Sequence, residues 1–136
     1  MPTDFSFQEG DQFRWGRHIS ADDVQQFAAI VGDLNPIHLD AEFAANSFFK
    51  KRIVHGAFLA GLISKVLGMD FPGQGTVYIS QTSIFKRPVY VDTTVSVEIK
   101  VTQVITEKRR LVLDTNISNS DGEVCVAGSA TVWLPE

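Results

Sequence analysis

One segment restricts the possible folds more than any other, the run GAFLAGLISKVLGM at residues 56–69. It is long enough for a helix, contains no acidic residue, and is apolar on almost every side apart from Ser64 and Lys65. Such a helix has to be buried on most sides, although it is too short to span a bilayer. Gly61 costs this helix about 1 kcal/mol relative to alanine. We therefore expect another backbone to pack closely against Gly61.

The second half of the chain predicts what buries this helix. Beyond residue 75, apolar and polar residues alternate in runs such as TVSVEIKV, RLVLDTNI and EVCVAGSATVWL. A period of two is typical of antiparallel strands with one covered face, and Asp121-Gly122 is a strong hairpin signal. With a short opening strand, the expected strands cover residues 12–19, 76–87, 94–101, 110–117 and 123–134. The sequence therefore predicts an α+β fold in which one antiparallel sheet curls around the apolar helix.

The helices expected before this segment are shorter. Ser20 and Asp23 form a capping-box pattern ahead of an amphipathic stretch that Gly32 can end. Asp40 can cap a second helix over residues 41–47. No linker or repeat interrupts the chain, so residues 1–136 are expected to form a single domain.

Composition excludes several functional classes. The net charge of −4 argues against a nucleic-acid partner, and no segment predicts membrane insertion. The single cysteine, Cys125, excludes an internal disulfide and fits a reducing compartment. The first residues lack the basic and apolar pattern of a secretory signal, so a cytoplasmic location is expected. A phosphate-bearing ligand needs only a local basic cluster, and three exist, at residues 50–52, 86–87 and 108–110.

Between the first two helices lies GDLNPIH, at residues 32–38. Asn35 precedes a proline and is pushed towards an extended conformation, which predicts a rigid bend. Such a bend can aim Asp33 and His38 at one point, where they could hold and deprotonate a water molecule. The pattern alone also allows a hydrogen-bonded turn without catalytic function. A metal site is a further alternative, with possible ligands His38, Asp40, Glu42 and His55, although no metal-binding spacing is present.

Two positions on the apolar helix add to the catalytic interpretation. Gly56 stands at its start, where free N–H groups and the helix dipole favour negative charge, as an oxyanion requires. The glycine could instead simply turn the chain. Ser64 lies mid-helix, where a serine usually bonds back to its own helix, but it could orient Asp33 or His38.

Together, DLNPIHLD, RIVHGAFLAGLIS and GTVYISQTSIFKRPVYVDTTV resemble the MaoC-like (R)-specific enoyl-CoA hydratases over roughly residues 12–134. The resemblance implies a single hot-dog fold, with a five-stranded antiparallel sheet around the long helix, and a homodimer or dimer of dimers. It implies syn addition of water to a trans-2-enoyl-CoA, giving an (R)-3-hydroxyacyl-CoA. No metal or other cofactor is implied, because coenzyme A is part of the substrate.

The resemblance also assigns roles to residues. It implies that Asp33 and His38 are catalytic and that the Gly56 N–H holds the thioester oxygen. Supporting positions are Asn35, Ser64 and His55, the last with a structural role. Lys86 and Arg87 are candidate partners for the phosphates of coenzyme A.

Alternatives remain at this point. A hot-dog thioesterase would need a carboxylate on or beside the central helix, and residues 56–69 contain none. A non-catalytic acyl-CoA-binding module would not need the Asp33–His38 pair. An acyl carrier protein could replace coenzyme A as the thioester donor.

Overall fold

The computed structural model describes residues 5–136 of the chain, and its elements follow the predicted order. The strands are β1 (Gln12–Ile19), β2 (Val77–Phe85), β3 (Thr93–Ile105), β4 (Arg110–Ser118) and β5 (Val124–Trp133). The helices are α1 (Ala21–Val31), α2 (Pro36–Leu39), α3 (Ala41–Ala45) and α4 (Gly56–Met69), with a short 3₁₀ turn, η1 (Thr106–Lys108).

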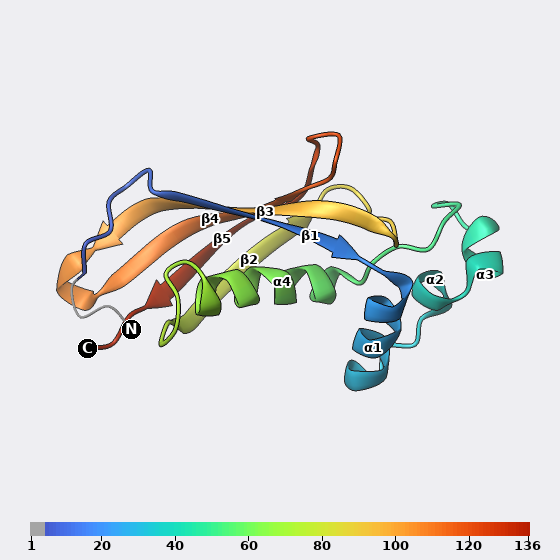
Figure 1. The fold of residues 1–136 in the computed structure, drawn as a ribbon, viewed down its shortest axis with the longest axis horizontal. Coiled ribbons are helices and arrows are strands. Elements are labelled where there is room, and N and C mark those ends of the chain that lie inside the picture. The colour runs from blue at the N-terminus through green and yellow to red at the C-terminus, as the bar shows by residue number, and fades with distance from the viewer. Residues whose placement is uncertain (1–4) are drawn as a thin grey trace.

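The five strands form one antiparallel sheet in the order β1-β3-β4-β5-β2. β1 and β2 are therefore its edges. The sheet curves over α4, which runs along one of its faces, while α1, α2 and α3 gather at one end of the molecule (Figure 1). This arrangement confirms the predicted α+β hot-dog fold with a long helix against the sheet.

The core lies between α4 and the covered face of the sheet. One side of α4 supplies Leu59, Ile63 and Val66, which are almost completely buried. The alternating residues of the central strands meet them, as the period of two requires: Val95, Val97, Ile99, Val101, Leu111, Leu113, Ile117, Val126 and Val132. Because these side chains come from both halves of the chain, the helix and the sheet stabilise each other through one shared core.

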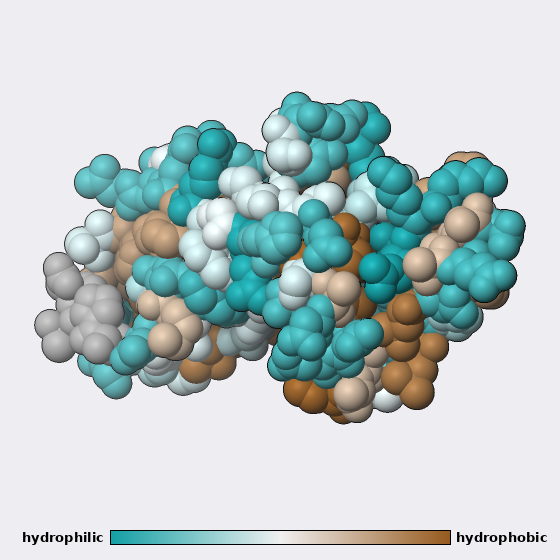
Figure 2. All heavy atoms as spheres, turned by 45° about the vertical axis from the view of Figure 1, so that its right-hand side comes forward, coloured by the Kyte–Doolittle hydropathy of each residue, from teal (hydrophilic) through white to brown (hydrophobic). Residues whose placement is uncertain are grey.

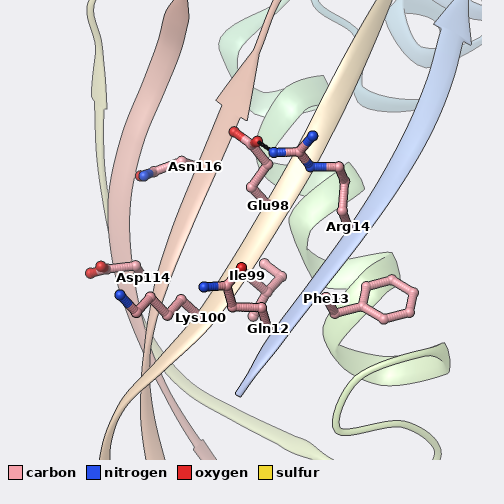
Figure 3. Close-up of a pocket in the computed structure, with 8 residues that line it drawn as sticks. All are labelled: Gln12, Phe13, Arg14, Glu98, Ile99, Lys100, Asp114 and Asn116. Atoms are coloured by element: carbon pink, nitrogen blue, oxygen red, sulfur yellow. Dashed lines mark hydrogen bonds and ion pairs between the residues drawn. The ribbon is translucent and has the colours of Figure 1, made fainter. Parts of the chain in front are cut away.

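The opposite face of the sheet is polar, and within residues 5–136 it carries no comparable packing. Figure 3 shows polar side chains of β1, β3 and β4 on this face, with Arg14 paired to Glu98. Lys100 faces Asp114 across β3 and β4 in the strand register. Exposed ion pairs of this type contribute about 0–1 kcal/mol each, so this face is best described as the solvated side of the sheet.

The structure differs from the sequence predictions at several boundaries. Residues 36–39 form a helical turn, α2, where a rigid bend was predicted. The Asn35 side chain accepts a hydrogen bond from the Ile37 N–H, and Pro36 occupies the first helical position, where its missing N–H has no cost. α3 ends at Ala45 rather than Ser47, and β3 continues to Ile105.

Other sequence expectations concern α1 and α4. The capping box of Ser20 and Asp23 is present, and Gly32 ends α1 with a φ of 82°. Around Gly61, however, an added Cβ would meet no atom within 4 Å. The predicted close backbone is therefore not supplied by the chain's own residues 5–136. No helix in that range is sufficiently long and apolar to cross a membrane.

Candidate active site

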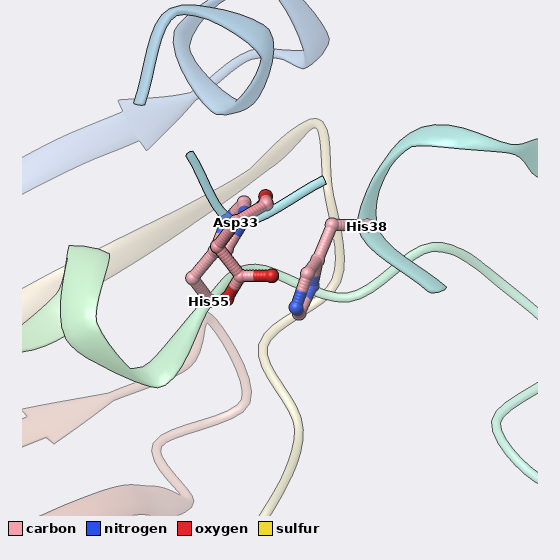
Figure 4. A group of neighbouring side chains, drawn as sticks. All are labelled: Asp33, His38 and His55. Carbon is pink, nitrogen blue, oxygen red and sulfur yellow. The ribbon is translucent and has the colours of Figure 1, made fainter. Parts of the chain in front are cut away.

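The structure brings Asp33 and His38 together with His55. Asp33 lies in the link after α1, His38 on α2, and His55 immediately before α4. One ligand atom from each lies within 4.8 Å of the others. Figure 4 shows the Asp33 carboxylate directed towards the His38 ring. The α2 turn accomplishes this, because it carries His38 back towards the end of α1.

His38 is held in one tautomer. Its Nδ1 lies 2.6 Å from the carbonyl oxygen of Ile53. A carbonyl only accepts hydrogen bonds, so Nδ1 carries the hydrogen and donates it, and Nε2 is left with the free lone pair. The ring is 9% exposed. His38 therefore presents a fixed, accessible base in an otherwise buried setting.

The environment also favours the neutral form of this base. Burial lowers the pKa of His38 below its usual 6.5, and the proximity of His55 lowers it further. The hydrogen bond to Ile53 and the Asp33 carboxylate oppose this by favouring the charged imidazolium. Burial dominates, so His38 can accept a proton at neutral pH.

Asp33 has a different environment. Its side chain is exposed in the single chain, and its carboxylate accepts a hydrogen bond from the Asn35 N–H at 3.2 Å. Asn35 thus contacts the loop on both sides, through Asp33 and through Ile37. This supports the shaping role that the resemblance implied for Asn35.

Gly56 begins α4 beside the pocket. Phe58 and Leu59 donate to the His55 carbonyl, while the Gly56 N–H lies in the first turn, where no intrahelical acceptor is available. A Cβ at Gly56 would lie 3.0 Å from two ring carbons of Phe85. A larger residue would therefore require the Phe85 ring to shift, whereas glycine leaves the helix start able to approach a ligand oxygen with its N–H.

A pocket opens in front of these groups. His38 and Gly56 belong to its wall, whereas its remaining lining is mostly apolar, with two basic residues at the end of β2. The other lining residues are Phe48, Phe49, Ile53, Val54, Leu59, Phe85, Lys86, Arg87, Pro88 and Val89. Arg87 also pairs with Glu123 at 3.2 Å. An apolar pocket with a polar catalytic edge and a basic side is suited to an acyl thioester with a phosphate-bearing carrier.

Several predicted positions are not part of this cluster. Ser64 is exposed on α4, about 12 Å along the helix from Gly56 at 1.5 Å per residue. The described residues show no hydrogen bond from Ser64 to Asp33 or His38. Asp40 caps α3 by accepting from the N–H groups of Glu42 and Phe43, so the first metal-ligand set considered is not assembled.

The group of Asp33, His38 and His55 has the residue types of a metal site, but its geometry is poor for one. The two imidazole rings are stacked, with centroids 3.7 Å apart and planes inclined by 26°. Nitrogen lone pairs lie in the ring planes, so the two rings direct them side by side rather than towards a common point. A metal ion needs converging ligands.

Two contributors to the site were missed by the sequence analysis. The Ile53 carbonyl fixes the tautomer of His38, and a backbone oxygen leaves no signal in residue type. Phe85 packs against Gly56 from an edge strand. The sequence offered no signal for this contact, because a single apolar residue at a strand end is common.

Known proteins resemble this chain in sequence and fold. Residues 5–121 match the family model described as the MaoC like domain. The chain is 41% identical over 130 residues to the (R)-specific enoyl-CoA hydratase of Aeromonas caviae, covering 96% of this chain and 97% of that protein. It is 48% identical over 120 residues to the 3-hydroxybutyryl-CoA dehydratase of Methylorubrum extorquens, covering 88% and 76%.

The solved structures agree with the sequence comparison. The structure of the (R)-hydratase from A. caviae involved in PHA biosynthesis superposes with a TM-score of 0.93 at 41% identity, covering 96% of this chain and 98% of that one. The family model covers most of the chain, and the relatives extend the match to nearly all of it. The chain therefore belongs to the MaoC-like domain family.

Proposed function

We propose that this protein is an (R)-specific enoyl-CoA hydratase, a hydro-lyase that adds water across the double bond of a trans-2-enoyl-CoA. The observation that carries the proposal is the held neutral His38, whose free Nε2 lies in the same cluster as the Asp33 carboxylate and on the same pocket as Gly56. Similarity to a hydratase and a dehydratase of the same reaction class supports it.

In the proposed reaction, Asp33 and His38 hold one water molecule between them. His38 Nε2 accepts a proton from this water while the oxygen of the water bonds to C3 of the enoyl group. The electrons of the double bond move to the thioester oxygen, giving an enolate. The imidazolium then returns a proton to C2 on the same face, so that water is added overall and His38 is regenerated. One base serving both steps accounts for a syn addition, and the (R) product follows when the water attacks the corresponding face of C3.

The negative charge on the thioester oxygen needs a donor, and Gly56 supplies it in this scheme. Its N–H points from the first turn of α4, where the helix dipole adds partial positive charge. Removing one donor of this kind typically costs 10²–10³-fold in kcat. Since water and protons are the only other reactants, the scheme requires no metal and no redox cofactor.

The basic residues Lys86 and Arg87 are proposed to contact the phosphates of the carrier. They lie on the same pocket as His38, so a thioester in the pocket can extend past them. Coenzyme A is the expected donor. A thioester on acyl carrier protein carries a phosphate on its prosthetic arm too, and the two donors are separated by assaying both.

We also propose that the active unit is a homodimer. In the single chain, several large apolar side chains near the site and on the edge strand β2 are exposed: Ile30, Val31, Leu34, Tyr78, Ile79, Ile84 and Phe85. Figure 2 shows hydrophobic side chains gathered on the lower side of the end that carries the helices. An exposed apolar edge strand invites pairing with another strand, and a second copy would cover both features.

The dimer gives Ser64 a possible role. Ala57, Gly61 and Ser64 share the exposed side of α4, and their small size lets a partner approach closely. Ser64 does not reach Asp33 or His38 within its own chain. If Ser64 supports the catalytic pair, it therefore does so across the dimer, at the site of the other copy.

The thioesterase alternative receives less support from the site. A hydrolytic water would need a carboxylate on or beside the central helix. α4 from Gly56 to Met69 carries none, and the carboxylate beside its start is Asp33, which the hydration scheme uses. A binding module without catalysis would not require the held tautomer of His38. Both alternatives predict outcomes that one assay distinguishes.

The test is hydration of crotonyl-CoA, followed by the loss of enoyl-thioester absorbance with chiral analysis of the product. We expect (R)-3-hydroxybutyryl-CoA from the wild type and near-complete loss in Asp33→Asn. Longer enoyl-CoAs and enoyl thioesters of acyl carrier protein define the donor. Release of free thiol would instead establish a thioesterase, and absence of turnover with every thioester would contradict the enzymatic proposal.

A further inference from the structure

His55 is a buried histidine that the proposed reaction does not use. Its side chain is 2% exposed, although it stands at the start of α4 and forms no side-chain cap there. Its Nε2 lies 3.1 Å from the main-chain carbonyl oxygen of Asp33. Because a carbonyl only accepts, Nε2 carries the hydrogen and donates it to the loop that presents the Asp33 carboxylate.

The same ring contacts the other catalytic residue. It stacks on the His38 imidazole, with centroids 3.7 Å apart, and Phe27 packs against it at 5.0 Å. The remaining nitrogen, Nδ1, is buried without a hydrogen-bond partner within residues 5–136. A hydrogen on this nitrogen would be buried without an acceptor, so the arrangement favours the tautomer whose hydrogen lies on Nε2 and goes to Asp33.

From these contacts we infer that His55 is a positioning residue, which holds the Asp33 loop through its Nε2–H and supports the His38 base with its ring. This inference deepens the proposed hydratase function and rests on it. The chain has no other side chain among the described residues that contacts both catalytic residues in this way. A structural role alone would require neither a donor directed at Asp33 nor a ring parallel to His38.

The ring has a further consequence for protonation. Two stacked imidazoles 3.7 Å apart cannot both carry a positive charge without strong repulsion, and the ring also keeps water from that side of His38. Both effects lower the pKa of His38. The other charged groups that face His38 are Asp33, which acts in the opposite direction, and Lys86 and Arg87 across the pocket.

Two substitutions separate the donor from the ring. His55→Gln retains an amide N–H that can reach the Asp33 carbonyl but removes the ring. His55→Phe retains a ring for the stack but removes the donor. His18→Gln is the control, since His18 is exposed on β1 and its Nδ1 contacts Thr94 Oγ1 at 3.2 Å.

The measurement is the pH profile of kcat/KM for crotonyl-CoA hydration, with thermal unfolding of each variant as a check on folding. In His55→Gln, we expect the acid limb to move to higher pH by about half a unit or more, because His38 is more easily protonated once the second ring is gone. In His55→Phe, we expect kcat to fall about tenfold or more with KM little changed, since Asp33 is misplaced, and no shift of the limb to higher pH. His18→Gln should match the wild type.

The ¹⁵N chemical shifts of the His38 ring provide a readout that does not depend on turnover. They should show a higher His38 pKa in His55→Gln than in the wild type. An unchanged His38 pKa and an unchanged acid limb in His55→Gln would overturn the inference, as would variants that lose stability and activity in parallel with no other change. If the wild type hydrates no enoyl thioester, the proposed function fails. The ¹⁵N chemical shifts of the His38 ring still decide whether His55 lowers the pKa of His38.

Discussion

The two sides of α4 differ in how far they are buried. The side that faces the sheet is packed, with Leu59, Ile63 and Val66 almost fully buried. The other side exposes Gly61 and Ser64 to open space. The single chain therefore buries one side of α4 against the sheet and leaves the other side exposed.

The same contrast separates His38 from Asp33. His38 is buried, with contacts to Ile53 and His55, whereas the Asp33 carboxylate is exposed and, among the described contacts, accepts a bond only from the Asn35 N–H of its own loop. From this difference we propose that one chain is sufficient to orient His38, whereas the proposed second copy covers Asp33. The predictions below test that division.

The largest effect is expected from Asp33→Asn, which should lower kcat by about 10³-fold, because the water loses the carboxylate that holds it against His38 and the general acid–base catalysis of the pair, typically worth 10²–10⁴-fold, is lost. Thermal stability should change little because Asp33 is exposed.

If Ser64 acts across the dimer, Ser64→Ala will also be impaired, and refolding a mixture of Asp33→Asn and Ser64→Ala will recover activity. Each mixed dimer then contains one site with both native residues. A mixture no more active than its parents would place Ser64 in its own chain's site or outside it.

A second prediction breaks the comparison at α4. Gly61→Glu places a charge on the open side of the helix, where an added Cβ meets no atom of the same chain. The chain should fold but remain monomeric in analytical ultracentrifugation, and hydration should fall at least 10²-fold because the Asp33 side stays uncovered. Gly61→Ala is the matched control and should remain dimeric. A fully active monomer of Gly61→Glu would show that one chain is sufficient.

How far the sequence anticipated these features depends on the kind of signal involved. The alternation in residues 94–101 and 110–117 and the apolar run at 56–69 predicted the sheet and the helix, because burial imposes a period on the side chains. The α2 turn was missed since Asn35-Pro36 is compatible with either a bend or a helix start. The Ile53 carbonyl could not be anticipated, because main-chain atoms are the same at every position.

Open space at Gly61 marks another limit. The sequence predicted a closely packed neighbour at Gly61, and residues 5–136 place none there. A sequence pattern cannot say whether such a neighbour would be another segment or another copy. Ser64 has the same ambiguity. Side-chain patterns report that a surface is covered, not by which molecule it is covered.

A third prediction concerns the crowded start of α4. Gly56→Ala would place a Cβ 3.0 Å from the Phe85 ring, so either the ring or the helix start must move. We expect kcat to fall by about tenfold to 10²-fold as the N–H is displaced from the thioester oxygen. Phe85→Leu in the same chain should restore part of the loss by making room. Failure of the double variant to recover would mean that the methyl group itself blocks the substrate.

The smallest expected effect is the pH dependence of stability that His38 causes, and it tests how completely the single chain buries this residue. Because burial lowers its pKa in the folded chain, the unfolded chain binds more protons between that value and about 6.5, the usual histidine value. The free energy of unfolding should therefore fall as the pH drops below 6.5. The fall is at most about 1.4 kcal/mol for each unit by which folding lowers the pKa of His38. His38→Asn, whose amide can still donate to the Ile53 carbonyl, should flatten this dependence in urea unfolding measured from pH 7 to pH 5. The same slope in wild type and variant would show that the protonation of His38 is not linked to folding, and that the base is less completely held than its contacts indicate.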